Sequence, residues 1–406
     1  MNNSQSFDFL IIGAGIVGLT IARQLRLSWG SKVRILVIEK EQNIGLHSSG
    51  RNSGVMHSGI YYPAHTLKAK ICGEGGREMT DWCEDRKLPV RRIGKVLVPV
   101  SKADASQIKV LMERGIQNGV LVERLDEQQL RELEPEVRSA TGEAIWCPVT
   151  SVIDPKAVLN ALAVELANEN IEIRTNTAFL AVDRSHQTIR TSAGKIHYGY
   201  VVNAAGLFAD KIAHVFGIAE NLTLLPFKGI YWQLAPSANL DIRHLIYPVP
   251  DLRVPFLGVH TTTSIEGTIY FGPTAVPAWG RENYSGCNGL SIKDTGNILY
   301  RLAQQFVDDK QGFRRLARQE MPRYFKPAFV KAAQAIVPKL RAQHLQACHK
   351  VGIRAQMLDT QKGELVMDFL IENGDHETHI LNAISPAFTS AFPFARFVVD
   401  NFIHKR

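Results

Sequence analysis

The stretch D-F-L-I-I-G-A-G-I-V-G at residues 8–18 decides how this chain begins to fold. A short apolar run of the kind that forms a buried strand breaks into Gly13, Gly15 and Gly18, and an apolar helical pattern begins at Ile16. In dinucleotide-binding folds such glycines permit a tight turn, close approach of the backbone to a pyrophosphate, and close packing of helix on strand. The pyrophosphate then lies at a helix N-terminus, where N–H groups and the helix dipole favour negative charge. The pattern therefore predicts nucleotide binding, and the alternative is a glycine turn that serves packing alone.

A second apolar run, R-I-L-V-I-E-K at residues 34–40, carries a carboxylate at Glu39. Its distance from Gly18 matches the spacing of about 20 residues at which an acid accepts hydrogen bonds from the ribose hydroxyls of a bound dinucleotide. Two strands, a glycine turn, a helix and an acid at this spacing are a more specific signal than the glycines alone. We therefore predict that Glu39 binds the adenosine ribose.

The composition is that of an ordinary globular protein, because 45% of the 406 residues are hydrophobic and 21% are charged. This length allows two domains with sizeable cores. We see no secretory leader before the first strand and no apolar run of the roughly 18 residues that a spanning helix needs. We therefore expect a cytoplasmic protein, either in solution or at the inner face of the cytoplasmic membrane. Five cysteines without a C-x-x-C pair predict reduced thiols and no metal site.

The formal net charge is +8, and the excess is partly local. The clustered basic residues are Arg314, Arg315, Arg318, Arg323, Lys326 and Lys331, with Lys405 and Arg406 at the end of the chain. An anionic substrate, an acidic membrane surface or nucleic acid could use such a field, and a solvated helix face is the plainest interpretation. Residues 392–406 combine helical apolar spacing with a basic end, which predicts packing on the nucleotide domain, with peripheral membrane contact as the other option.

The middle of the chain changes character twice. After Glu39 comes the polar, glycine-rich segment G-L-H-S-S-G-R-N-S-G-V-M-H-S-G at residues 45–59, which can either wrap a long cofactor or form a flexible surface loop. A later strand at residues 198–204 runs into A-G-L-F-A-D, which repeats the logic of the first turn. Between residues 226 and 273, short runs rich in β-branched and aromatic residues predict an antiparallel sheet.

Several motifs together resemble the D-amino-acid-oxidase-type FAD-dependent oxidoreductases. The motifs shared with this superfamily are G-A-G-I-V-G with Glu39, S-G-R-N-S-G, N-A-A-G-L-F-A-D and the late G-I-R-A-Q. Within the superfamily, H-S-G-I-Y-Y (57–62), L-K-A-K-I-C (67–72), F-L-G-V-H (256–260) and G-P-T-A-V (272–276) are most similar to L-2-hydroxyglutarate dehydrogenase/oxidase. The similarity extends from Asp8 to about residue 390, nearly the whole chain.

The resemblance implies a mixed α/β fold with two domains. A Rossmann-like FAD-binding domain is predicted from residues 1–90, 145–225 and 345–406, and a substrate domain with an antiparallel sheet from residues 91–144 and 226–344. FAD is expected to be non-covalent, because the spacing from His57 to Gly59 does not match that of relatives that link flavin to histidine. The predicted cofactor-binding residues are Gly13, Gly15, Gly18, Glu39, Arg51, Asn52, Ser53, Gly54, Ala205, Gly206, Asp210, Ser385, Thr389 and Ser390.

The same resemblance suggests residues for the chemistry, which is formally a hydride transfer from the carbon that bears the hydroxyl to flavin N5. Arg354 of G-I-R-A-Q is predicted to bind the substrate carboxylate, because a planar guanidinium forms two parallel hydrogen bonds with it. His57 and His260 are the two candidates for the base that accepts the hydroxyl proton, since a base has to be neutral near pH 7. Tyr61, Tyr62 and Lys228 are further candidates for substrate contact, with packing as the alternative.

The predicted reaction is FAD-dependent oxidation of an L-2-hydroxy acid, with L-2-hydroxyglutarate and 2-oxoglutarate as the expected pair. The subfamily pattern R-G-E-Y-Y is K-G-I-Y-W at residues 228–232 here, so this strand lacks the arginine and the glutamate of the subfamily. The alternatives are an amino-acid or amine oxidase of the same fold, a nicotinamide dehydrogenase, and a nucleic-acid-associated flavoprotein, although we find no nucleic-acid-binding module and expect no such partner. Oxygen, a quinone and an electron-transfer protein remain open as electron acceptors.

Overall fold

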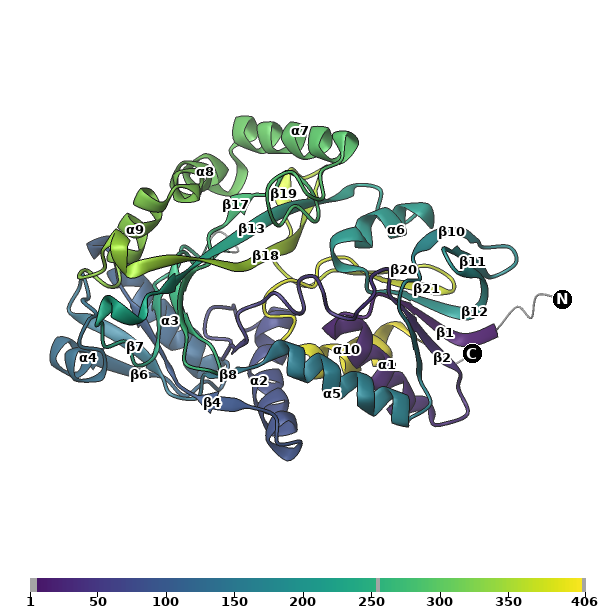
Figure 1. Ribbon diagram of the computed structural model, residues 1–406, viewed down its shortest axis with the longest axis horizontal. Helices are drawn as coiled ribbons and strands as arrows, with labels where there is room; N and C mark the ends of the chain where they lie inside the picture. Colours follow the sequence, from purple (N-terminus) through teal and green to yellow (C-terminus); the bar gives the residue numbers. More distant parts are fainter. Residues whose placement is uncertain (1–5, 253–255, 404–406) are drawn as a thin grey trace. The chain divides into compact units, whose positions relative to one another are not determined.

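Two units of structure share this chain, which passes between them four times (Figure 1). The computed structural model describes residues 6–252 and 256–403, so the basic residues Lys405 and Arg406 lie outside the described residues. The first unit comprises residues 1–52, 155–225 and 354–406, and the second comprises residues 53–154 and 226–353. Two of the passages fall within long strands, β13 (Leu222–Leu234) and β18 (Leu345–Asp359).

The first unit is built on an eight-stranded sheet whose central strands are parallel. β1 (Ser6–Ile12) lies between β12 (Gly194–Asn203) and β2 (Ile35–Ile38), and β9 (Glu172–Arg174) follows β2. The sheet continues from β12 to β11 (Thr188–Thr191) and β10 (Phe179–Asp183), and also to β21 (Glu377–Ile380) and β20 (Ile371–Asn373). The fully buried run of β1 and β2 is what parallel strands covered on both faces require. The predicted fold class is confirmed.

Helices cover this sheet, and the first of them starts at the glycine turn. α1 (Ile16–Trp29) packs against α5 (Pro155–Asn168) and against the C-terminal helix α10 (Ala391–Phe402), while α6 (Ala209–Val215) contacts β12 and β21 (Figure 1). The apolar residues of α10 are largely buried, and the Arg23 guanidinium lies over the Phe392 ring. The predicted packing of the terminal helix is therefore confirmed, and its apolar face is already covered.

The second unit contains the antiparallel sheet predicted from residues 226–273. β13 pairs with β16 (Ile269–Gly272) and β17 (Val276–Pro277), and β16 pairs with β15 (His260–Thr263). β18 completes this sheet beside β13, and the end of β18 that belongs to the first unit pairs with the short β19 (Glu364–Leu365). A second sheet has the order β14 (Leu245–Pro248), β5 (Lys95–Val98), β7 (Glu143–Cys147) and β6 (Glu123–Asp126).

A third, three-stranded sheet shifts the predicted domain boundaries. β3 (Val55–Met56) and β4 (Val90–Arg92) both pair with β8 (Ser151–Ile153). Segments 53–90 and 145–154, which we assigned to the nucleotide domain, therefore belong to the second unit, as do residues 345–353 of β18. The sequence does not indicate that β3 and β4 pair with β8, because these strands are distant along the chain.

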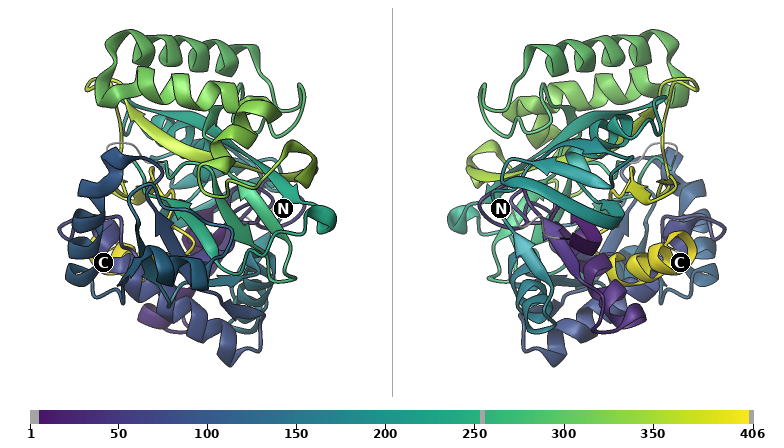
Figure 2. Two further views of the ribbon diagram at one scale, coloured as in Figure 1. Left: turned by 90° about the vertical axis from the view of Figure 1, so that its left-hand side faces the viewer. Right: turned by 90° about the vertical axis from the view of Figure 1, so that its right-hand side faces the viewer.

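Helices complete the second unit. α2 (Leu67–Asp85), α3 (Ala105–Gln117) and α4 (Glu127–Leu133) come from its first segment. α7 (Ile292–Asp308), α8 (Phe313–Glu320) and α9 (Lys326–Gln334) come from its second segment, and α7 and α8 lie side by side (Figure 2). Within the described part of the chain, no helix is both long enough and apolar enough to cross a bilayer.

Candidate active site

The glycine turn of the first unit has the close contacts that its sequence predicts. Gly13 has φ of +108°, and a Cβ there would lie 2.6 Å from the carbonyl oxygen of Ala204. A Cβ on Gly18 would lie 2.0 Å from the carbonyl oxygen of Gly13. Any larger residue at either position would push the turn away from its neighbours. The turn therefore brings the start of α1 against the end of β12, where Ala204 donates to the Ile12 carbonyl at 2.9 Å.

Glu39 lies at the same turn. One carboxylate oxygen accepts the Ala14 N–H at 3.0 Å and the other accepts the Glu41 N–H at 3.1 Å. These bonds fix the carboxylate beside the glycines at the end of β2, which is the position that ribose binding needs. Binding of the ribose itself stays a prediction.

The loop that follows Glu39 contributes a residue that sequence reasoning missed. Ser49 Oγ accepts the Ile16 N–H at 2.9 Å, so a hydroxyl occupies one of the donors at the N-terminus of α1. Arg51 and Asn52, both predicted cofactor residues, donate to carbonyls of their own loop, Arg51 Nε to Leu46 at 2.7 Å and Asn52 Nδ2 to Ser49 at 2.6 Å. The loop is thus braced against α1 rather than loose. A serine in a polar, glycine-rich segment after the acid was the available signal for Ser49.

The middle segment of the chain reaches the same turn. Asn203, at the end of β12, accepts the Ala205 N–H at 3.2 Å and donates to the Ala209 carbonyl at 2.8 Å. Gly206 has φ of +52°, and the buried Asp210 carboxylate accepts the Leu224 N–H at 2.9 Å. The structure therefore brings Ala205 to the glycine turn and uses Asp210 to hold the start of β13. Cofactor contact by these residues stays a prediction.

The last predicted cofactor residues flank the start of α10. Ser385 is exposed, whereas Thr389 and Ser390 are buried. Ser390 Oγ is buried without a hydrogen-bond partner among the described residues. A buried hydroxyl of this kind costs free energy unless something else satisfies it. The unsatisfied hydroxyl, the glycine cradle and the fixed Glu39 carboxylate all fit a bound dinucleotide such as FAD.

In the second unit, the H-S-G-I-Y-Y segment is held by α3. Arg114 Nη1 donates to the Tyr61 carbonyl at 2.6 Å, and Asn118 Nδ2 donates to the carbonyls of Gly59 at 3.0 Å and Tyr62 at 2.9 Å. Upstream, the predicted cofactor residues Ser53 and Gly54 lead into β3, and the Gly54 carbonyl accepts the Ile153 N–H at 2.9 Å. The segment that carries His57, Tyr61 and Tyr62 is therefore rigidly placed in this unit.

His260 has a defined tautomer. Its Nδ1 lies 2.8 Å from the Gly258 carbonyl oxygen, and because a carbonyl can only accept, Nδ1 carries the proton. The neutral ring then has its lone pair on Nε2. His260 is 5% exposed, and its ring stacks on that of Tyr247 with centroids 3.8 Å apart and an interplanar angle of 21°. This geometry suits a proton acceptor.

His57 is buried beside Lys95 and His260. Burial, the charge of Lys95 and the nearby His260 lower the pKa of His57 to about 3. An imidazole with such a pKa is neutral near pH 7 but accepts a proton poorly. Which of the two histidines accepts the proton stays a prediction.

Lys95 and Tyr247 were missed by the sequence analysis. Lys95 is 0% exposed, and its Nζ lies 4.7 Å from the Tyr61 ring centroid and 5.5 Å from that of Tyr247. Burial lowers the pKa of Lys95 and raises the pKa of both tyrosines. The signal in the sequence was a lysine inside the otherwise apolar strand G-K-V-L-V.

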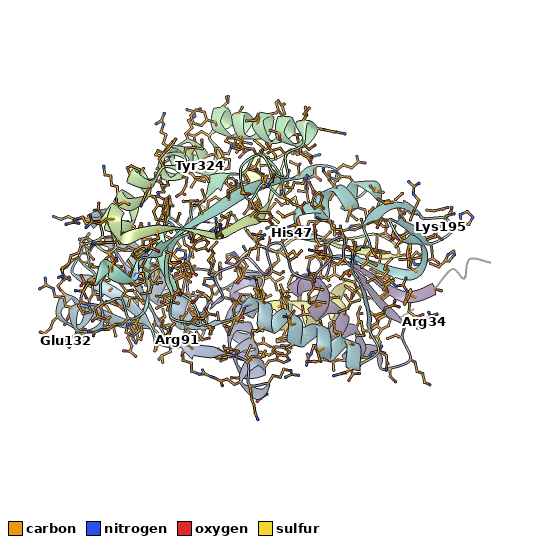
Figure 3. The ribbon with its side chains drawn as sticks, viewed as in Figure 1. Arg34, His47, Arg91, Glu132, Lys195 and Tyr324 are labelled. Atoms are coloured by element: carbon orange, nitrogen blue, oxygen red, sulfur yellow. The ribbon has the colours of Figure 1, made fainter. Side chains whose placement is uncertain are left out.

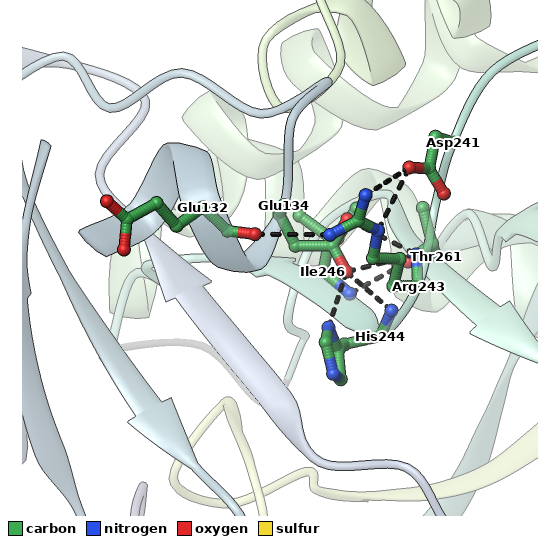
Figure 4. A network of polar contacts seen from close by, with 7 residues as sticks. All are labelled: Glu132, Glu134, Asp241, Arg243, His244, Ile246 and Thr261. Carbon is green, nitrogen blue, oxygen red and sulfur yellow. Dashed lines mark hydrogen bonds and ion pairs between the residues drawn. The ribbon is translucent and has the colours of Figure 1, made fainter. Parts of the chain in front are cut away.

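A buried carboxylate supports the strand that carries Tyr247 (Figure 4). Glu134 Oε1 accepts the N–H of Arg243 at 3.1 Å and that of His244 at 2.5 Å, and lies 2.7 Å from His244 Nδ1. Further along, the Ile246 N–H donates to Thr261 Oγ1 at 2.7 Å, which ties β14 to β15. The network thus fixes the two strands that hold Tyr247 and His260.

The remaining predicted substrate residues have different surroundings. Lys228 is 4% exposed and donates from Nζ to Asn283 Oδ1 at 2.9 Å, and Asn283 in turn donates to the carbonyls of Gly286 and Asn288. Lys228 therefore anchors the loop after β17, and substrate contact by it stays a prediction. Arg354 lies on β18 in the first unit and is half-buried. Tyr62 is also half-buried, with its ring centroid 6.4 Å from that of Tyr61.

Two named relatives match almost the whole chain. The chain is 34% identical to L-2-hydroxyglutarate dehydrogenase from Escherichia coli, over 97% of this chain and 92% of the relative. It is also 34% identical to the mitochondrial L-2-hydroxyglutarate dehydrogenase of Bos taurus, over 98% of this chain and 89% of the relative.

Solved structures share the fold at lower sequence identity. The FAD-bound, dithionite-reduced L-α-glycerophosphate oxidase from Mycoplasma pneumoniae matches with a TM-score of 0.76 at 21% identity, covering 99% of this chain and 96% of its own. Glycine oxidase from Geobacillus kaustophilus matches with a TM-score of 0.69 at 15% identity, covering 98% and 94%. The family model described as DAO, FAD dependent oxidoreductase, matches residues 8–401. The chain therefore belongs to the DAO family of FAD-dependent oxidoreductases.

Proposed function

We propose that this enzyme oxidises L-2-hydroxyglutarate to 2-oxoglutarate. The substrate is supported by full-length relatives named for this activity. The observation that carries the reaction class is His260, whose Nδ1–H is engaged by the Gly258 carbonyl and whose Nε2 is thereby set to accept a proton. Oxidation of a hydroxyl needs a group that accepts the hydroxyl proton. An amine substrate that is already neutral does not need such an acceptor.

Other residues of this chain would bind the cofactor and the substrate. The Gly13 turn, Glu39, Ser49 and Ser390 would hold FAD, which supplies a two-electron acceptor when bound. Arg354 would bind the substrate carboxylate through two parallel hydrogen bonds and so fix the orientation of the carbon that is oxidised. His260 Nε2 would take the hydroxyl proton in the same step. The products would be a 2-oxo acid and a protonated imidazole, and the hydride lost from the carbon, with its two electrons, would go to the FAD acceptor.

Product identity tests this proposal against the amino-acid oxidase alternative. Incubation of the purified enzyme with L-2-hydroxyglutarate and an artificial electron acceptor is expected to yield one 2-oxoglutarate for each two electrons transferred. Glutamate, which differs only in bearing an amine, serves as the matched substrate. Ammonia release from glutamate at a comparable rate would favour the amino-acid oxidase instead.

The flavin should be bound without a covalent link. The glycine cradle, Glu39 and the hydroxyls of Ser49 and Ser390 offer hydrogen bonds and close backbone contact, and these are lost when the protein unfolds. The purified protein is expected to be yellow and to release one FAD per chain on acid or heat denaturation. Separation of the supernatant from the precipitated polypeptide measures this. Flavin that remains with the precipitate would contradict the prediction.

We further propose that an anionic, cytoplasm-facing bilayer is a partner, so that electrons pass to a quinone. The cysteines are all thiols, which fits a reducing compartment. α7 exposes an apolar stripe in which Ile292 is 97% exposed and Val307 69% exposed, and Phe325, which follows α8, is 70% exposed. Tyr324, which is labelled in Figure 3, belongs to the same segment and is 47% exposed. We call residues 290–326 the α7–α8 surface.

Charge favours an anionic lipid surface at this position. The α7–α8 surface carries eight lysines and arginines against four acids. Exposed apolar side chains among basic residues are typical of helices that lie in a membrane interface. The terminal helix α10, whose apolar face is buried, offers no comparable stripe.

Vesicle binding tests the α7–α8 surface. The wild-type enzyme is expected to sediment with phosphatidylglycerol-containing vesicles, and the triple variant Ile292→Glu, Val307→Glu, Phe325→Glu should bind at least about tenfold more weakly, because it removes buried apolar area and adds repulsion. The control replaces three exposed apolar residues elsewhere, Ile116, Leu121 and Val164, by glutamate. Equal loss in both variants, or no binding of the wild type, would refute the surface.

A further inference from the structure

Lys95 is buried in a way that lysines rarely are. It lies on β5 between β14 and β7, paired with Leu245 on one side and Cys147 on the other. Its side chain is 0% exposed, and its Nζ has no hydrogen-bond acceptor among the residues that the structure describes. A lysine is almost never fully buried unless it is paired. Something other than a carboxylate therefore accounts for this position.

Two tyrosine rings surround the ammonium in place of an acid. Nζ lies within cation–π range of both Tyr61 and Tyr247. Buried tyrosine hydroxyls usually find a hydrogen-bond partner, yet those of Tyr61 and Tyr247 have none among the described residues. The contacts that these rings make include Lys95 Nζ over both of them and, for Tyr247, the stacked ring of His260.

The backbone is shaped to hold Lys95 there. The preceding residue, Gly94, has φ of +70°, and a Cβ on it would lie 1.9 Å from the Trp146 ring. Trp146 in turn contacts His244 edge-on, with ring centroids 4.8 Å apart, and His244 binds the buried Glu134. The same network that fixes β14 and β15 thus also reaches the turn before Lys95.

Several titratable side chains face Lys95 and the two histidines. The Cys147 and Cys72 thiols and the two phenols face Lys95. Lys95 and His260 face His57, and Tyr247, which also faces Tyr231, stacks on His260. A positive charge on Lys95 disfavours a positive charge on His57, which it faces.

We propose that Lys95 is a positioning residue of the active site, which fixes the Tyr247 ring against His260 through the contacts of its Nζ with the two tyrosine rings. The inference rests on the proposed role of His260 as the proton acceptor. Lys95 acts through Tyr247 and through its field, so it remains a positioning residue rather than a catalytic one. When Lys95 carries its proton, its charge also disfavours protonation of a neighbouring imidazole, so the base stays neutral to lower pH than an isolated histidine would.

The test compares Lys95→Met with the wild-type holoenzyme. Methionine has nearly the same length without the charge, and replacing a buried charge by an apolar residue of similar volume is often neutral for stability. We expect unchanged FAD content and melting temperature and a kcat lower by about tenfold. The acid limb of the kcat/KM profile should move upward by about half a pH unit or more, because loss of a nearby positive charge raises the pKa of a histidine.

A spectroscopic measurement separates the proposed effect of Lys95 on His260 from a purely structural role of Lys95. NMR titration of isotope-labelled histidine, with His260→Gln used to assign the signal, should show the pKa of His260 rising in Lys95→Met and unchanged in Lys95→Arg. The matched control is Lys350→Met, since Lys350 Nζ also lies over two tyrosine rings, 5.4 Å from that of Tyr231 and 4.6 Å from that of Tyr270. Lys350→Met should leave the acid limb in place.

The outcomes are distinct. An acid limb and a His260 titration that are unchanged in Lys95→Met overturn the inference, as does an equal shift in Lys350→Met. If Lys95→Met does not fold, Tyr247→Leu carries the test: a kcat lower by about tenfold or more with full FAD supports the inference, and an unchanged kcat overturns it. A wild-type enzyme that does not oxidise L-2-hydroxyglutarate overturns the proposed function, while the NMR titration still decides the effect of Lys95.

Discussion

Replacing His260 by glutamine is expected to lower kcat by roughly 10²- to 10⁴-fold, because glutamine cannot accept the hydroxyl proton. The amide can still donate a hydrogen bond, so the β15 strand should keep its place. The FAD content should match that of the wild type, and the acid limb of the pH profile should disappear. Steady-state kinetics between pH 5 and 9 (about the range in which histidine titrates) measures both effects.

His57→Gln is the matched control for this variant. The pKa of His57 is about 3, so its imidazole is a weak base and its replacement should lower kcat by less than about tenfold. A larger loss in His57→Gln than in His260→Gln would reverse the two assignments.

Replacing Arg354 by alanine is expected to cost about 2–4 kcal/mol of substrate recognition, or roughly 30- to 1000-fold in kcat/KM, because it removes a charge-assisted bidentate contact. Arg354→Lys should recover little, since an ammonium cannot reproduce the planar fork of the guanidinium. FAD content, measured by absorbance after acid release, should be unchanged.

The outcome that contradicts this role is specific. If Arg354→Ala keeps near-normal turnover at low substrate concentration and loses its flavin, Arg354 belongs to the cofactor site or to the fold. Lys228→Met provides a comparison, because Lys228 already donates to Asn283 and should affect kcat/KM less than Arg354.

The nucleotide-binding turn was predictable because its determinants are local. Gly13 and Gly18 meet steric limits set by residues of the same turn and by the adjacent strand end, and Glu39 follows at a fixed spacing. The motif therefore identified the start of α1 at Ile16 and the position of the acid. Ser49 was not predicted, because the residue whose N–H it accepts, Ile16, lies 33 positions earlier and the loop that carries Ser49 has no periodic pattern.

The second unit was harder to predict because its site is assembled from distant strands. Lys95, Tyr247 and His260 lie on three different strands, and no spacing along the chain indicates that their side chains meet. For the same reason we expected residues 53–90 in the nucleotide domain, whereas they lie in the second unit. β3 and β4 pair there with β8, which is distant along the sequence. Family resemblance marked His57 and His260 as candidates, and the division of roles that we propose for them rests on the bond of His260 to Gly258 and on the burial of His57.

The central claim is tested most directly by anaerobic bleaching of the bound flavin in a stopped-flow spectrometer. L-2-hydroxyglutarate should bleach the flavin absorbance in a single fast phase, with D-2-hydroxyglutarate, L-lactate and L-glutamate at least about 100-fold slower at equal concentration, because they lack the configuration, the second carboxylate or the hydroxyl that the site is proposed to recognise. Bleaching by L-glutamate or another amino acid at the faster rate, with L-2-hydroxyglutarate inert, would contradict the account.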